Sequence, residues 1–115
     1  MRGILNDFTD GLRDFGQQCP DVMQGFMNML HPAFQDGAVS VKQKELIAIG
    51  LGVYTGNEHC ISYHVHKAIE CGASQQEILE AASVAVTFGG GPAIAHIFTS
   101  VQDALQAFAG TTTSR

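Results

Sequence analysis

Apolar side chains recur every three or four residues along most of the chain, the spacing of one face of an α-helix. Near the start, five residues form such a stripe: Ile4, Leu5, Phe8, Leu12 and Phe15. A second stripe follows Pro20, which suits the first turn of a helix, and is disturbed at His31 and Pro32. No stretch alternates polar and apolar residues over a strand length. The pattern predicts an all-α protein that begins with helices over 4–17 and from Pro20 onward, with the methionines of the second helix in the core.

Two capping sequences mark the starts of later helices. Ser40 is followed three residues later by Gln43, and Ser74 by Glu77, and both pairs have the pattern of a capping box. In a capping box, the first side chain and the fourth each accept a hydrogen bond from the other residue's backbone N–H. These signals predict helices over about 41–55 and 75–88.

Between these helices lies a fourth, over roughly 58–71, with Gly56 ending the helix before it and Asn57 as its N-cap. Because helices 41–55 and 58–71 are joined by almost no loop, we expect them to pack as a central antiparallel hairpin. Such a hairpin brings Glu45 and His64 within about one helical turn of each other along its axis.

The Gly-Gly-Gly-Pro stretch at 89–92 should break the fifth helix and begin a sixth, running to about Phe108. The sequence therefore predicts six helices in one domain, 1–115, with a disordered tail at 111–115. The hydrophobic share of 45% is enough for one core in a chain of 115 residues.

Charge and composition exclude several classes of function. The net charge of −5 and the absence of a Lys/Arg cluster argue against nucleic acid and anionic membranes as partners. No uninterrupted apolar run reaches the ~18 residues of a membrane span, and the first residues lack the apolar core of a signal peptide. Three cysteines are few, and an odd number cannot all pair within one chain, unlike the even set of a secreted disulfide framework. We therefore expect a cytoplasmic location and reduced thiols.

The residues that carry candidate chemistry gather around Cys60, which falls in the first turn of the helix after Asn57. Unpaired N–H groups and neighbouring imidazoles in such a turn favour a thiolate. His64 lies four residues on and shares a helix face with Cys60, and Glu45 can orient its ring. The arrangement predicts a nucleophile, a base and an orienting carboxylate.

Other interpretations of these residues remain open. A lone cysteine in a helix is more often a packing residue than a nucleophile, and we interpret Cys19 and Cys71 in that way. Zinc bound by His59, Cys60 and His64 is disfavoured because His59 points about 100° away from Cys60 around the helix. No second Cys/His pair completes such a site. We therefore expect neither a metal nor a cofactor.

The order of these motifs over about 26–108 resembles the carboxymuconolactone decarboxylase family, and within it the alkylhydroperoxidase D-like branch. The motifs are Lys44-Glu45-Leu46-Ile47-Ala48, Gly56-Asn57-Glu58-His59-Cys60 with His64, Glu70-Cys71-Gly72-Ala73-Ser74 with Glu77-Ile78, and Gly89-Gly90-Gly91-Pro92 leading to His96. The resemblance implies the six-helix alkylhydroperoxidase D-like fold.

The resemblance also implies a thiol-dependent peroxidase activity. Cys60 would attack a hydroperoxide, with Glu45, His59 and His64 forming a proton relay. Three further residues are expected at the substrate pocket: Asn57, Tyr63 and His96. Asn57 stands where the branch has the first cysteine of its Cys-x-x-Cys pair, so the resolving thiol is missing and an external thiol would regenerate Cys60.

Two alternatives stand beside this hypothesis. One is a decarboxylase-like enzyme in which His64 and Glu45 move protons on a small organic acid and Cys60 only lines the pocket. The other is a non-enzymatic, oligomeric redox-sensing or binding module.

Assembly into a homo-oligomer is expected from the apolar surface of the last two predicted helices. From Ile78 to Phe98, Glu80 is the only formally charged residue besides the titratable His96. So much apolar surface in a small domain is usually buried by another subunit. The resemblance implies a hexamer built as a trimer of dimers, with the site near a subunit boundary that brings His96 toward Cys60.

Overall fold

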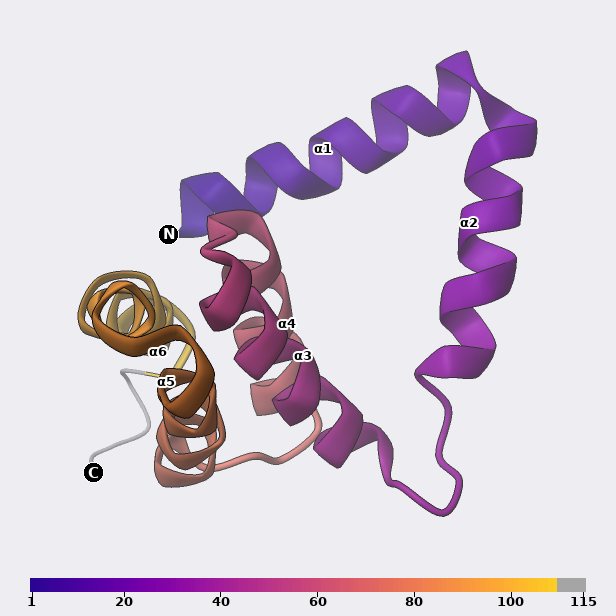
Figure 1. Ribbon diagram of the computed structural model, residues 1–115. Coiled ribbons are helices and arrows are strands. Elements are labelled where there is room, and N and C mark those ends of the chain that lie inside the picture. The colour runs from indigo at the N-terminus through magenta and orange to yellow at the C-terminus, as the bar shows by residue number, and fades with distance from the viewer. Residues whose placement is uncertain (110–115) are drawn as a thin grey trace.

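The computed structural model describes residues 1–109, and all their regular structure is helical (Figure 1). In chain order the elements are α1 (Arg2–Gln18), α2 (Pro20–Ala33), α3 (Val41–Thr55), α4 (Glu58–Glu70), α5 (Gln75–His96), the π-helical turn η1 (Ile97–Val101) and α6 (Gln102–Ala109). The all-α prediction is confirmed. The tail expected to be disordered, 111–115, lies outside the described residues.

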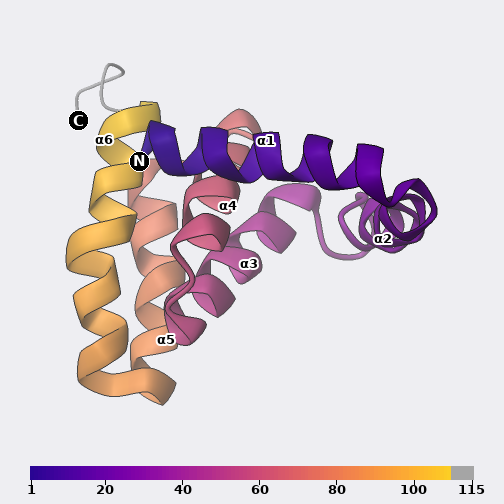
Figure 2. The ribbon, with the colours of Figure 1, turned by 90° about the horizontal axis from the view of Figure 1, so that it is seen from above.

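The prediction of six separate helices is slightly off. From Gln75 through η1 to Ala109 the helical turns follow one another with no loop between them, so residues 1–109 contain five helical segments. The break predicted at 89–92 is present as a sharp kink at Gly90, whose φ of 64° and ψ of −141° are non-helical and suit glycine alone. The chain turns back at this kink, and the following helical part returns beside the first part of α5 (Figure 2).

The run Gln75–Phe108 is long and apolar enough to cross a membrane by length and composition, with a mean hydropathy of 1.4 in its most apolar window. The kink at Gly90 divides it into two halves, each shorter than the ~20 residues that a helical span needs. Both halves contribute fully buried residues to the core, among them Ile78 and Val101. The run is therefore a folded-back helix pair that contributes one face to the core and leaves much of its apolar surface exposed, since 22% of the apolar window is buried.

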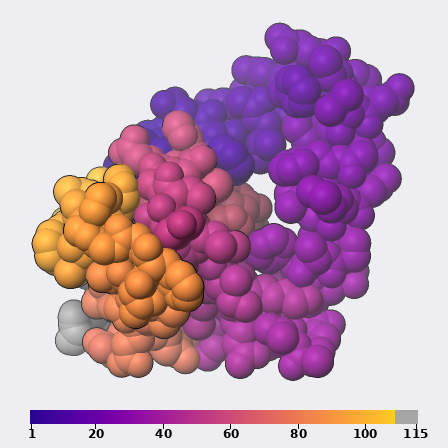
Figure 3. All heavy atoms as spheres, viewed as in Figure 1, coloured from indigo at the N-terminus to yellow at the C-terminus, as the bar shows by residue number. Residues whose placement is uncertain are grey.

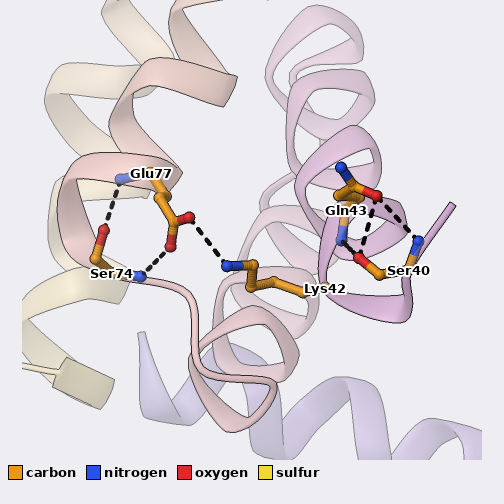
Figure 4. Close-up of polar contacts among 5 residues, drawn as sticks. All are labelled: Ser40, Lys42, Gln43, Ser74 and Glu77. Atoms are coloured by element: carbon orange, nitrogen blue, oxygen red, sulfur yellow. Dashed lines mark hydrogen bonds and ion pairs between the residues drawn. The ribbon is translucent and has the colours of Figure 1, made fainter. Parts of the chain in front are cut away.

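Both capping boxes are present, and an ion pair links the two helices that they begin (Figure 4). Ser40 Oγ accepts from Gln43 N–H at 3.1 Å, and Ser74 Oγ accepts from Glu77 N–H at 3.0 Å. Lys42 Nζ lies 3.0 Å from Glu77 Oε2 and so joins α3 to α5. The hydrogen bond from the Ser74 backbone, followed by that from Lys42, lowers the pKa of Glu77 from 4.5. Because the pKa of Glu77 is lower in the folded protein than in the unfolded chain, these contacts stabilise the fold fully at pH values above 4.5. Their contribution is lost as the pH falls through the lowered pKa.

The hydrophobic core lies among α3, α4, α5, η1 and α6. Its largest fully buried apolar side chains are Ile49, Val53, Ile61, Val65, Ile78 and Val101. Helix α3 packs against both α4 and α5, and α4 packs against α6. The α3–α4 hairpin is thus held on both sides, which gives the residues on it a rigid support.

Helices α1 and α2 form an arm that leaves this core. Neither helix has a buried residue. Helix α1 crosses α4 and packs against it, whereas α2 stands apart from α3, with an opening between them (Figures 1 and 3). The expectation that the methionines of α2 fill the core is wrong within one chain, since Met27 and Met29 are exposed. Pro32 lies in the last turn of α2, which ends one residue later at Ala33.

Candidate active site

The turn between α3 and α4 places Cys60 in the first turn of α4. Gly56 ends α3 in the left-handed conformation, with a φ of 70°, and the Oδ1 atom of Asn57 accepts a hydrogen bond from Cys60 N–H at 3.1 Å. Gly52 lets α4 approach α3 at this level. A Cβ on Gly52 would lie 3.1 Å from the Ile61 side chain and 3.5 Å from Cys60 Cβ. The half-buried thiol of Cys60 is therefore held close to the hairpin axis.

One turn further along α4, His64 is paired with Glu45 of α3. His64 Nδ1 lies 2.7 Å from Glu45 Oε1, so the contact expected from the hairpin register is present. Glu45 is 6% exposed, which is rare for a carboxylate unless it has a partner. Because the carboxylate engages Nδ1, Nε2 is the ring nitrogen of His64 through which a proton could be exchanged.

Two aromatic rings hold the imidazole of His64 in place. Phe34, which follows the end of α2, stacks on it with ring centroids 5.5 Å apart and an interplanar angle of 13°. Tyr63 meets it edge-on, with centroids 5.1 Å apart. Phe34 was not predicted as a site residue. It continues the spacing of Phe26 and Leu30 and caps the end of α2, but only the tertiary structure places that end beside His64.

A groove of about 480 Å³ opens at Cys60 between α1 and the start of α4. It is lined by Asp7, Phe8, Gly11, Leu12, Phe15, Asn57, His59 and Cys60. The ring of Phe8 lies 6.3 Å from that of His59 and 5.3 Å from that of Tyr63, centroid to centroid. The α1 stripe was predicted only as one face of an amphipathic helix, without a link to Cys60. The stripe itself was visible, but the surface that it faces was not.

The structure brings the predicted site residues into two adjoining groups. Glu45, Tyr63 and His64 form one, while Asn57, His59 and Cys60 form the other along the groove. In residues 1–109, no hydrogen bond joins Cys60 to His64. No group of three or more His, Cys, Asp and Glu side chains in this part of the chain is placed to hold a metal ion.

His96 lies at the turn before α4. A Cβ on Gly56 would be only 2.8 Å from His96 Nε2, so this imidazole sits directly against the Gly56 backbone of its own chain. His96 therefore approaches the hairpin turn four residues before Cys60 without a second subunit.

All three cysteines are free thiols. Cys71 caps the far end of α4, about 16 Å from Cys60 along the helix and beyond the reach of a disulfide. Burial, followed by the charges of Glu45 and Glu70, raises the pKa of the Cys71 thiol above its ordinary 9.0. At neutral pH, Cys71 therefore carries less thiolate than an unperturbed cysteine.

Known proteins share this fold and sequence pattern. An uncharacterised protein from Cupriavidus necator is 32% identical over 92 residues, which cover 80% of this chain and 81% of that protein. The crystal structure of a carboxymuconolactone decarboxylase family protein from Legionella pneumophila superposes with a TM-score of 0.85 at 34% identity, covering 97% of this chain and 96% of that one.

A second crystal structure is that of a carboxymuconolactone decarboxylase family protein from Thermotoga maritima, for which involvement in the antioxidative response has been suggested. It superposes with a TM-score of 0.69 at 30% identity, covering 76% of this chain and 90% of that one. The model of the family itself matches residues 20–103, which include Glu45, Cys60 and His64. The hairpin that carries these three side chains is thus part of a shared fold, and the chain belongs to the carboxymuconolactone decarboxylase family.

Proposed function

We propose that the protein is a thiol-dependent peroxidase that reduces hydroperoxides with Cys60. The observation that carries the proposal is the placement of a free thiol at the groove, one helical turn from the Glu45–His64 pair. A thiol, a base and an orienting carboxylate are the parts that nucleophilic catalysis by cysteine requires. The suggested antioxidative role of the Thermotoga maritima relative agrees with this chemistry.

The reaction begins when Cys60, as thiolate, attacks the terminal oxygen of a hydroperoxide R–O–O–H. A sulfur–oxygen bond forms, the O–O bond breaks, and Cys60 becomes a sulfenic acid. The leaving RO⁻ takes the proton that the thiol gave up and departs as the alcohol ROH. Sulfur is oxidised by two electrons and the peroxide is reduced by two.

An external thiol then completes the cycle, since Asn57 occupies the position of a nearby resolving cysteine. The first thiol molecule forms a mixed disulfide with Cys60 and releases water, and a second thiol restores Cys60 and leaves as a disulfide. In this scheme, His64 Nε2 transfers the proton, Glu45 holds the ring through Nδ1, and His59 at the groove assists the leaving oxygen. Tyr63 and His96 help to shape the surroundings of the site.

The Glu45–His64 pair also supports a second candidate, a decarboxylase-like proton transfer on a small organic acid. An acid substrate needs a cationic partner in the site. The lysines near the hairpin already have other partners: Lys42 pairs with Glu77, Lys44 Nζ donates to the carbonyl oxygen of Gln35, and Lys67 pairs with Glu70. For this reason the peroxidase is the stronger proposal.

Chemical trapping of the sulfenic acid tests the peroxidase proposal. We expect one equivalent of an organic hydroperoxide, added at neutral pH with dimedone, to give a dimedone adduct on Cys60 and none on Cys71. The raised pKa of Cys71 leaves little thiolate to be oxidised, and its labelling should increase only as the pH rises. Peptide mass spectrometry measures both sites. Equal labelling of Cys60 and Cys71 at neutral pH would contradict the assigned role of Cys60.

We expect the protein to form a homo-oligomer, with the hexamer of the family resemblance as the specific prediction. One chain exposes two apolar surfaces, the face of α2 that includes Phe26 and Met29, and a groove of about 580 Å³ between α3 and α5. In that groove Phe88 is 79% exposed. Surfaces of this kind are normally buried by a partner. Light scattering coupled to size-exclusion chromatography measures the mass, and a stable monomer at micromolar concentration would refute the expectation.

A further inference from the structure

Helix α1 forms one complete wall of the groove at Cys60. It lies across α4 (Figure 2), and its groove-lining residues Phe8, Leu12 and Phe15 have the spacing i, i+4 and i+7 of a single helix face. The wall is therefore apolar, with Asp7 as its one charged residue. Helix α1 also precedes residues 20–103, the part of the chain that matches the family model.

Gly11 is the residue of this wall that lacks a side chain. It lies between Phe8 and Leu12 on the groove side, in helical backbone that any residue adopts. A Cβ placed on Gly11 would meet no atom within 4 Å. Packing within the chain therefore does not require glycine here, and glycine disfavours a helix interior. What Gly11 provides is free space in the wall above Cys60.

We propose that α1 selects the molecules that reach Cys60, and that Gly11 sets the size of the group admitted. The substrate class is named on the basis of the peroxidase proposal: a neutral hydroperoxide with a bulky apolar group, aryl or branched alkyl. Its apolar part lies against Phe8 and Leu12 in the space over Gly11, while its O–O bond reaches Cys60. The carboxylate of Asp7 disfavours substrates that carry a negative charge.

Side chains of increasing size at position 11 test the wall through the alkylation rate of the Cys60 thiol, a measurement that does not depend on peroxidase activity. The variants are Gly11→Ala and Gly11→Leu, and Gly25→Leu in α2 is the matched control. Gly25 is also an exposed mid-helix glycine with no atom within 4 Å of an added Cβ, but it does not line the groove. Because Gly25 adjoins the apolar face of α2 expected to meet another subunit, light scattering checks that Gly25→Leu keeps the wild-type mass. Both leucine substitutions therefore raise helix propensity equally, and they differ in whether they fill the groove.

The first measurement is the alkylation rate of Cys60 with small iodoacetamide and with bulky N-benzylmaleimide, read at the Cys60 peptide by mass spectrometry. We expect Gly11→Leu to lower the rate at which N-benzylmaleimide alkylates Cys60 by about tenfold, the lower end of what a misfitting group costs in an apolar pocket. Gly11→Ala should have an intermediate effect. Iodoacetamide should react at an unchanged rate. Gly25→Leu should change neither rate. The wall proposal is overturned if Gly11→Leu affects both reagents equally or neither.

The second measurement is the rate of reduction of cumene hydroperoxide relative to hydrogen peroxide. We expect Gly11→Leu to lower this ratio in parallel with N-benzylmaleimide reactivity. If wild-type protein consumes no peroxide while size-selective alkylation holds, the peroxidase proposal fails and the wall stands. If peroxide is consumed but the ratio stays the same in Gly11→Leu, α1 does not select the substrate and the peroxidase proposal stands.

Discussion

The Cys60→Ser variant is expected to lose hydroperoxide reduction, with the rate falling by roughly a thousandfold or more, as when an essential nucleophile is removed. A serine hydroxyl fits the same half-buried position in the first turn of α4, but it does not attack the O–O bond of a peroxide and has no sulfenic acid state. The loss is therefore chemical, with the helix and its Asn57 cap intact. Peroxide consumption with an added thiol, followed in time, measures it.

Three further variants make this result specific. Cys19→Ser and Cys71→Ser should retain the wild-type rate, because neither residue lines the groove at Cys60. Glu45→Gln should lower the rate without abolishing it, since the amide still occupies the site beside His64 but no longer carries the charge that stabilises a protonated imidazole. If Cys60→Ser keeps its activity on a small organic acid while Glu45→Gln loses it, the proton-transfer candidate replaces the peroxidase. Oxidation of Cys60 without turnover would instead indicate a redox sensor.

The second large effect is expected from Asn57→Cys, which should convert the single-thiol site into one that forms its own disulfide. Positions 57 and 60 lie on the same helix face, and the Asn57 side chain already reaches the Cys60 backbone. A thiol introduced in place of the Asn57 amide can attack the sulfenic acid of Cys60 and release water, a step that an amide cannot perform. We expect one equivalent of peroxide to give a disulfide between Cys60 and the introduced cysteine, and dithiol-dependent turnover to rise.

Asn57→Ser is the matched control for this substitution, because serine keeps a capping oxygen and adds no thiol. Loss of the Asn57 cap in the cysteine variant should lower the free energy of unfolding by about 1 kcal/mol, which chemical denaturation measures. Mass spectrometry of the peroxide-treated proteins distinguishes the outcomes. A Cys60–Cys19 or Cys60–Cys71 linkage in the wild-type protein would show that a resolving thiol already exists elsewhere and would remove the basis of this prediction.

Local signals in the sequence were sufficient for the hairpin and for the residues on it. The Ser40 and Ser74 capping boxes fix where α3 and α5 begin, and the αL conformation of Gly56 ends α3. Each of these signals acts through hydrogen bonds between residues only a few positions apart, so the sequence alone contains both partners. The Glu45–His64 contact follows from the same local features, because a connection this short leaves two antiparallel helices a single register.

Contacts between distant segments were decided only by the tertiary structure. An apolar stripe indicates that one face of a helix will be buried, but it does not indicate which surface will cover that face. The stripe of α1 faces Cys60, and the methionine-rich face of α2 lies exposed, although both have the periodicity of core helices. Phe34 reaches His64 because the tertiary structure places the end of α2, which Phe34 caps, beside α4. The sequence by itself thus determined most of the helices, their caps and the catalytic candidates, whereas long-range packing decided the groove at Cys60.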